Sequence, residues 1–85
     1  MDKYSIEIVP KAEKEFSRLS EIIKSRVSSK IIVLEDNPRP FGCKKLVGTD
    51  YYRIRIGDYR VVYSIKDSSK TVKILSIAHR KEVYR

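Results

Sequence analysis

The segment YYRIRIGDYRVVY, residues 51–63, constrains the fold of this 85-residue chain more than any other stretch. Apolar or aromatic residues alternate with arginines on both sides of a Gly-Asp pair, which is typical of two strands joined by a tight turn. Gly57 at the first central position of a two-residue turn predicts a type II′ hairpin. Such a turn fixes the register, so that Arg55 faces Arg60 and Tyr52 faces Tyr63.

This register divides the hairpin into two faces, because side chains alternate along a strand. The face expected under the helices carries Tyr52, Ile54, Ile56, Tyr59, Val61, Tyr63 and Ile65. The other face carries Arg53, Arg55 and Arg60. Arg55 opposite Arg60 brings like charges together, which destabilises a sheet locally and would be relieved by a bound anion. The alternative without a ligand is that the arginines pair with neighbouring acids or extend into water.

The remaining sequence predicts one domain over residues 1–85. Residues 4–9 alternate as a strand, Pro10 suits the first turn of a helix, and Ser20 can cap a second helix that ends at Asn37-Pro38. A short edge strand at 44–46 precedes longer strands at 51–56, 59–66 and 71–79. We therefore expect an α+β fold: an N-terminal strand, a helical hairpin, then an antiparallel β-meander with both helices packed on one face of the sheet.

The formal charge of +8 lies entirely in the second part of the chain. Residues 1–37 hold seven Lys/Arg and seven Asp/Glu, whereas residues 38–85 hold twelve Lys/Arg and four Asp/Glu. This asymmetry favours a polyanionic partner, either a nucleic acid or an acidic protein, over a merely solubilising surface.

The sequence offers little for metal or membrane chemistry. Cys43 is the only cysteine, so no internal disulfide is possible, and no cluster of His and Cys surrounds it. No apolar run is long enough to span a membrane, and no leader is recognisable. We expect a cytoplasmic protein without metal or cofactor.

The run from Tyr52 to Tyr63, followed by Ile77-Ala-His-Arg80 and Val83-Tyr84-Arg85, resembles the RelE toxins of the RelE/ParE superfamily. The likeness covers nearly the whole chain, including Asn37-Pro38 and Lys45-Leu46-x-Gly48. The ending favours the RelE branch over the gyrase-poisoning ParE branch.

This resemblance implies an mRNA interferase that enters the ribosomal A site and cuts mRNA there without a metal. It also implies a RelB-like antitoxin as partner, which often wraps the toxin and displaces its C-terminal segment. On the matching motif, the functional positions of the family fall on Arg53, Arg55, Arg60, Arg80 and Tyr84.

Cutting RNA without a metal requires the 2′-hydroxyl to attack the adjacent phosphorus, with a base, an acid and stabilisation of the developing charge. Arg60 and Arg80 suit the last role, because guanidinium groups bind phosphate oxygens bidentately. Well-known family members carry lysine where Arg53 and Arg55 stand. Arginine keeps the grip on phosphate but stays charged, so it cannot replace a tunable base.

The base is therefore expected elsewhere. We favour Tyr84 as base or stacking platform, since surrounding arginines would lower the pKa of its phenol. His79 is the rival, because histidine side chains titrate near neutral pH. The lysines expected to steer the protein to ribosomal RNA by charge are Lys44, Lys45, Lys73 and Lys81.

Two other functions remain open. One is a ParE-like inhibitor of DNA gyrase, which binds a protein and cuts nothing itself. The other is an inactive relative that binds only RNA or an antitoxin.

Overall fold

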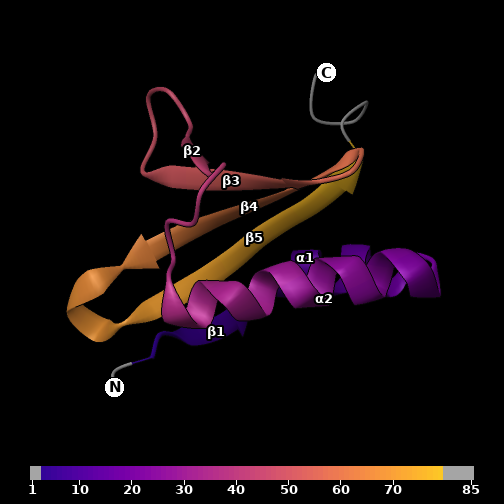
Figure 1. Ribbon diagram of the computed structural model, residues 1–85, viewed down its shortest axis with the longest axis horizontal. Helices are drawn as coiled ribbons and strands as arrows, with labels where there is room; N and C mark the ends of the chain where they lie inside the picture. The colour runs from indigo at the N-terminus through magenta and orange to yellow at the C-terminus, as the bar shows by residue number, and fades with distance from the viewer. Residues whose placement is uncertain (1–2, 80–85) are drawn as a thin grey trace.

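Two helices cover one side of a five-stranded sheet in the computed structural model, which describes residues 3–79 (Figure 1). In chain order the elements are β1 (Ser5–Ile8), α1 (Pro10–Ser17), α2 (Glu21–Asp36), β2 (Lys44–Lys45), β3 (Tyr51–Ile56), β4 (Tyr59–Lys66), a 3-10 turn η1 (Asp67–Ser69) and β5 (Thr71–His79). The strand order in the sheet is β1-β5-β4-β3-β2. The expected α+β fold is thus confirmed.

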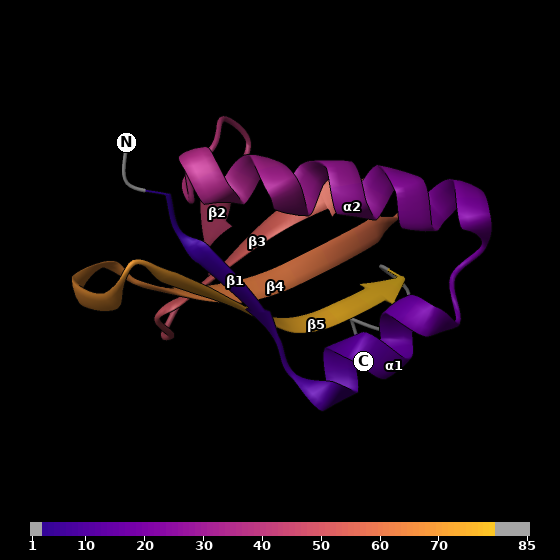
Figure 2. The ribbon, with the colours of Figure 1, turned by 90° about the horizontal axis from the view of Figure 1, so that it is seen from below.

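The sheet is mixed, which the sequence pattern did not reveal. Strands β2 to β5 form the antiparallel part, whereas β1 pairs in parallel with β5, from Ser5 opposite Thr71 to Ile8 opposite Ile74. Parallel neighbours need a long crossover connection, and here the rest of the domain supplies it. Strand β5 lies between β1 and β4, and α1 contacts β5, beside which it lies in Figure 2.

Local chemistry sets the bounds of both helices. Pro10 occupies the first turn of α1, where a missing N–H costs nothing. The Ser20 hydroxyl accepts a hydrogen bond of 3.3 Å from the Ile23 N–H and caps α2. Asn37, which precedes Pro38, is extended and ends α2 as predicted.

The core lies between the helices and one face of the sheet. Both helices contribute to it, and its members are Ala12, Val27, Ile31, Leu34, Ile54, Ile56, Val61, Tyr63, Val72, Ile74 and Ile77. The fully buried Tyr63 donates a hydrogen bond of 2.8 Å from its hydroxyl to the Pro38 carbonyl, which anchors the loop that follows α2. Burial raises the pKa of the Tyr63 phenol, so the phenol keeps the proton that it donates.

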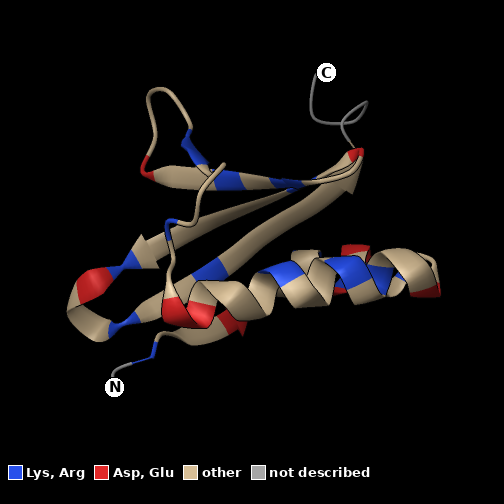
Figure 3. Cartoon of the chain, in the orientation of Figure 1, with Lys and Arg blue, Asp and Glu red and all other residues tan. Residues whose placement is uncertain are grey.

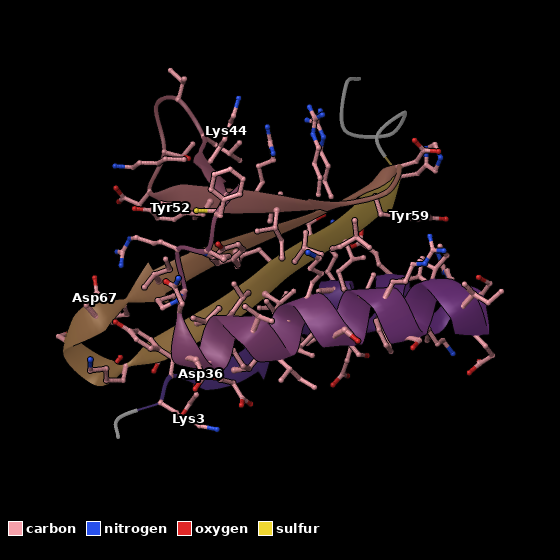
Figure 4. All side chains as sticks on the ribbon, viewed as in Figure 1. Lys3, Asp36, Lys44, Tyr52, Tyr59 and Asp67 are labelled. Atoms are coloured by element: carbon pink, nitrogen blue, oxygen red, sulfur yellow. The ribbon has the colours of Figure 1, made fainter. Side chains whose placement is uncertain are left out.

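A polar cluster joins four segments at the end of the sheet away from the Gly57 turn. Arg39, from the loop after α2, pairs with Asp67 at 3.0 Å and lies over the ring of Tyr52, while the Tyr4 hydroxyl also donates to Asp67. Figure 4 labels Tyr52 on β3 and Asp67 on the turn after β4. The Arg39 guanidinium holds the pKa of the Asp67 carboxyl below its usual value.

The hairpin has the predicted register. Arg55 lies opposite Arg60, Ile54 opposite Val61, and Tyr52 opposite Tyr63. Gly57 has a φ of 60° whereas Asp58 does not have a positive φ, as a type II′ turn requires.

Candidate active site

The candidate site lies on the outer face, by which we mean the side of the sheet that faces away from the helices. Ile54, Ile56 and Val61 are buried in the core, so their neighbours along each strand project to the outer face. Arg55 and Arg60 are direct cross-strand partners there. Arg53 lies on the same face, two residues further from the Gly57 turn, and these three residues form the arginine cluster.

Exposure differs among the three arginines. Arg55 is exposed, Arg53 is half-buried, and Arg60 exposes only 9% of its surface. A guanidinium with so little exposed surface occupies a position set by the fold, whereas Arg55 is accessible to a ligand. The cluster thus combines a positioned cation with an accessible one.

Acidic neighbours do not neutralise Arg55 within the described part of the chain. The four ion pairs found among residues 3–79 are Lys3–Asp36, Lys11–Glu15, Lys24–Glu21 and Arg39–Asp67. Asp50 and Asp58, the acids nearest in sequence to the cluster, are both exposed. Figure 3 shows Lys and Arg along β2 and β3, with an acidic residue at the turn between β3 and β4.

The predicted RNA-binding lysines divide between the two faces. Lys44 is the cross-strand partner of Arg53 and shares the outer face with it. Lys73 also lies on the outer face, opposite Ser64, but nearer the other end of β4. Lys45 pairs with Tyr52, so alternation directs it to the helix side, away from the arginine cluster.

The structure does not bring His79 to the arginine cluster. His79 is the cross-strand partner of Tyr59, and the two rings meet edge to face with centroids 5.2 Å apart. Both residues line a hollow on the helix side that also includes Glu15. Arg60, by contrast, pairs with Ala78, one residue earlier. The expectation that the end of the last strand carries His79 to the arginines is therefore not met.

Arg80, Lys81 and Tyr84 lie outside the described residues. Strand β5 ends at His79, at the same end of the sheet as the Gly57 turn. Arg80 thus comes two residues after Ala78, the cross-strand partner of Arg60.

No group of three or more His, Cys, Asp or Glu residues within 3–79 is arranged to hold a metal ion. In the same range, neither helix is both long enough and apolar enough to cross a membrane.

Comparison with known proteins identifies the family of this chain. The family model described as "ParE toxin of type II toxin-antitoxin system" matches residues 6–84. The chain belongs to the RelE/ParE toxin superfamily. The mRNA interferase toxin RelE of Escherichia coli K12 is 29% identical to this RelE/ParE toxin, over 95% of the chain and 90% of the relative.

Solved structures agree with this assignment. The archaeal RelE–RelB complex from Pyrococcus horikoshii OT3 contains a chain that is 36% identical, with a TM-score of 0.83, covering 94% of this toxin and 97% of that chain. The intact E. coli RelBE toxin–antitoxin complex matches with 26% identity and a TM-score of 0.80, covering 89% of this toxin and 95% of that chain. The named relatives are thus RelE toxins, although the matching family model carries the ParE description.

Proposed function

We propose that the protein is a ribosome-dependent endoribonuclease that cuts mRNA in the A site without a metal. The observation that carries the proposal is the direct opposition of Arg55 and Arg60 at the end of the sheet from which Arg80 follows. Like charges on directly opposed residues repel each other, and a phosphate group bound between them would reduce this repulsion. The name of the E. coli relative, mRNA interferase toxin RelE, supports action on mRNA, and the RelE–RelB complex supports an antitoxin as partner.

In the proposed reaction, the 2′-hydroxyl oxygen attacks the adjacent phosphorus and the bond to the 5′-oxygen of the next nucleotide breaks. The products are a 2′,3′-cyclic phosphate and a 5′-hydroxyl. Arg60 and Arg80 stabilise the additional negative charge on the phosphoryl oxygens in the transition state. Arg53 and Arg55 hold the RNA backbone, since guanidinium groups bind phosphate but do not release a proton.

Tyr84 is the proposed base, and the position of His79 on the helix side favours this choice. A base must come within hydrogen-bond reach of the proton that it removes. His79 shares a face with Tyr59 rather than with Arg55 and Arg60, so it would have to act across the sheet.

The experiment is primer extension on mRNA from cells that express the chain. We expect cuts confined to translated codons, lost in Arg60→Ala, Arg80→Ala and Tyr84→Phe and retained in His79→Ala. Arg26→Ala is the matched control, because Arg26 is an exposed arginine on α2. Intact message during growth arrest refutes the proposal.

A gyrase inhibitor is the second candidate, and the ParE description of the matching family model favours it. A gyrase inhibitor causes DNA breaks and an SOS response while the message stays intact. An inactive relative would give a third result, because combining Tyr84→Phe with His79→Ala would leave any growth defect unchanged.

The proposed function places the protein in the cytoplasm, with two partners. One is the ribosome, reached through the charge of Lys44 and Lys73 on the outer face and of Lys45 and Lys81. The other is a RelB-like antitoxin encoded beside the toxin. No cofactor is needed for the proposed reaction.

A further inference from the structure

The outer face extends well beyond the arginine cluster, and its far end carries an exposed aromatic ring. Tyr51 begins β3 and is 44% exposed. Its neighbour Tyr52 stacks on Tyr63 on the core side, so alternation directs Tyr51 to the outer face, the face of Arg53 and Arg55. A large exposed ring on a positively charged face has no role in the core.

A hollow adjoins Tyr51 on the same face. Tyr51 is the cross-strand partner of Ser64, and Ser64 is the partner of Lys73. Both residues line a hollow of about 390 Å³ together with Glu7, Lys66, Ser69 and Thr71. The hollow thus holds two ammonium groups, three hydroxyl groups and the one carboxylate of Glu7, and Ser64 connects it to Tyr51. This combination suits a nucleotide, whose phosphate attracts the ammonium groups and whose 2′-hydroxyl bonds to serine or threonine.

The distance along β3 between Tyr51 and the arginine cluster would let one RNA strand contact both. Tyr51 precedes Arg55 by four residues along one strand, which corresponds to about 13 Å at roughly 3.3 Å per residue. Lys44 and Arg53 lie between them on the same face. A strand of RNA that runs along β3 from Arg55 therefore meets cations first and the exposed ring a few nucleotides away.

We infer that Tyr51 is a base-stacking residue for single-stranded RNA, with Lys73, two strands away on the same face, as a contact to the phosphate backbone. This inference rests on the proposed function, because it assigns the far end of the outer face to the same RNA strand that is cut at the arginine cluster. Aromatic rings and basic grooves are the usual combination for holding single strands. RNA is favoured over an acidic protein because the ring adjoins hydroxyl and ammonium groups rather than an apolar groove.

The test measures binding of a fluorescein-labelled single-stranded oligoribonucleotide with intact 2′-hydroxyl groups, in the absence of ribosomes, because the proposed cleavage requires the ribosome. Loss of one stacked ring typically weakens binding by roughly 5- to 150-fold, so we expect Tyr51→Ala to raise Kd at least about 5-fold. Tyr51→Phe keeps the ring and retains affinity. Val47→Ala is the off-face control, because Val47 is a fully exposed residue of the β2–β3 loop. Lys73→Ala should lower the slope of log Kd against log salt concentration by about one.

A Kd for Tyr51→Ala within twofold of the wild type overturns the inference, as does failure of the wild type to bind the oligonucleotide. A loss of antitoxin binding in Tyr51→Ala with unchanged RNA binding also overturns it and assigns the ring to the protein partner. Cleavage of mRNA on ribosomes is measured separately with wild-type protein. Its absence refutes the proposed function, whereas binding that depends on Tyr51 bears on the stacking site alone.

Discussion

Replacing Arg55 by alanine should stabilise the folded protein and weaken its binding to RNA. A two-residue hairpin loop is closed by a hydrogen-bonded pair, here Ile56 and Tyr59, so the next pair, Arg55 and Arg60, is of the non-hydrogen-bonded kind. Cα atoms in such pairs are only about 4.5 Å apart, which brings the side chains closest together. The Arg55→Ala variant removes one of the two facing charges.

The size of the effect follows from this position. Directly opposed charges on neighbouring strands contribute about 0.2–1 kcal/mol, with an unfavourable sign when the charges are alike. A domain of this size gains about 4–8 °C in Tm for each kcal/mol. We therefore expect Arg55→Ala to raise Tm by about 1–8 °C in low salt. Salt screens exposed charges, so the gain should shrink as salt is added.

Thermal unfolding followed by circular dichroism measures this change, and Arg26→Ala on α2 is the control for removing an exposed arginine. Inorganic phosphate should raise the Tm of the wild type more than that of Arg55→Ala, because an anion between the two guanidinium groups removes their repulsion. A lower Tm for Arg55→Ala than for the wild type would refute the reasoning. It would mean that Arg55 stabilises the fold instead of being held against repulsion for a ligand.

Three further changes test the fold that positions the site. Tyr63→Phe leaves the Pro38 carbonyl without its buried donor and should cost about 1–3 kcal/mol, measured by urea unfolding. Ser20→Ala removes the cap of α2 and should lower the free energy of unfolding by about 1 kcal/mol, which appears as a lower urea midpoint with an unchanged m-value. The pKa of the Asp67 carboxyl is lowered in the folded state, chiefly by Arg39, so its contribution to stability is complete above the unfolded value of about 3.9 and is lost as pH falls through the lower folded value. The Tm difference between wild type and Asp67→Asn should therefore be present at neutral pH and vanish in acid; a difference that persists in acid would contradict this assignment.

The hairpin and the helix ends could be predicted because each depends on residues close together in sequence. The Gly57-Asp58 turn fixes the pairing of its flanking strands, and Ser20 and Pro38 mark where α2 starts and stops. The parallel pairing of β1 with β5 joins residues more than sixty positions apart. The alternation of apolar and polar residues identifies β1 and β5 as strands but does not show which strands they pair with.

The candidate site was predictable to the same extent. Alternation places Arg53, Arg55 and Arg60 correctly on one face, because the turn sets the register between them. The side of His79 depends on the irregularity in the β4–β5 pairing next to Val62 and Tyr63, where the register shifts. No residue in that stretch is of a type that predicts a bulge. The sequence could have predicted that Tyr51 lies on the same face as the arginines, because it alternates with them. Its exposure, however, follows only from the folded structure.

The inner position of β5 affects when the molecule can assemble. Residues 71–79 are made after every other described element, yet they lie between β1 and β4. Until they leave the ribosome, β1 has no strand to pair with and α1 has no β5 to pack on. A nascent chain can pair β2, β3 and β4 as they emerge, but it cannot join β1 to the sheet before β5 has been made. For a protein proposed to attack translation, the order of synthesis delays the harmful form until nearly all of the chain has been made.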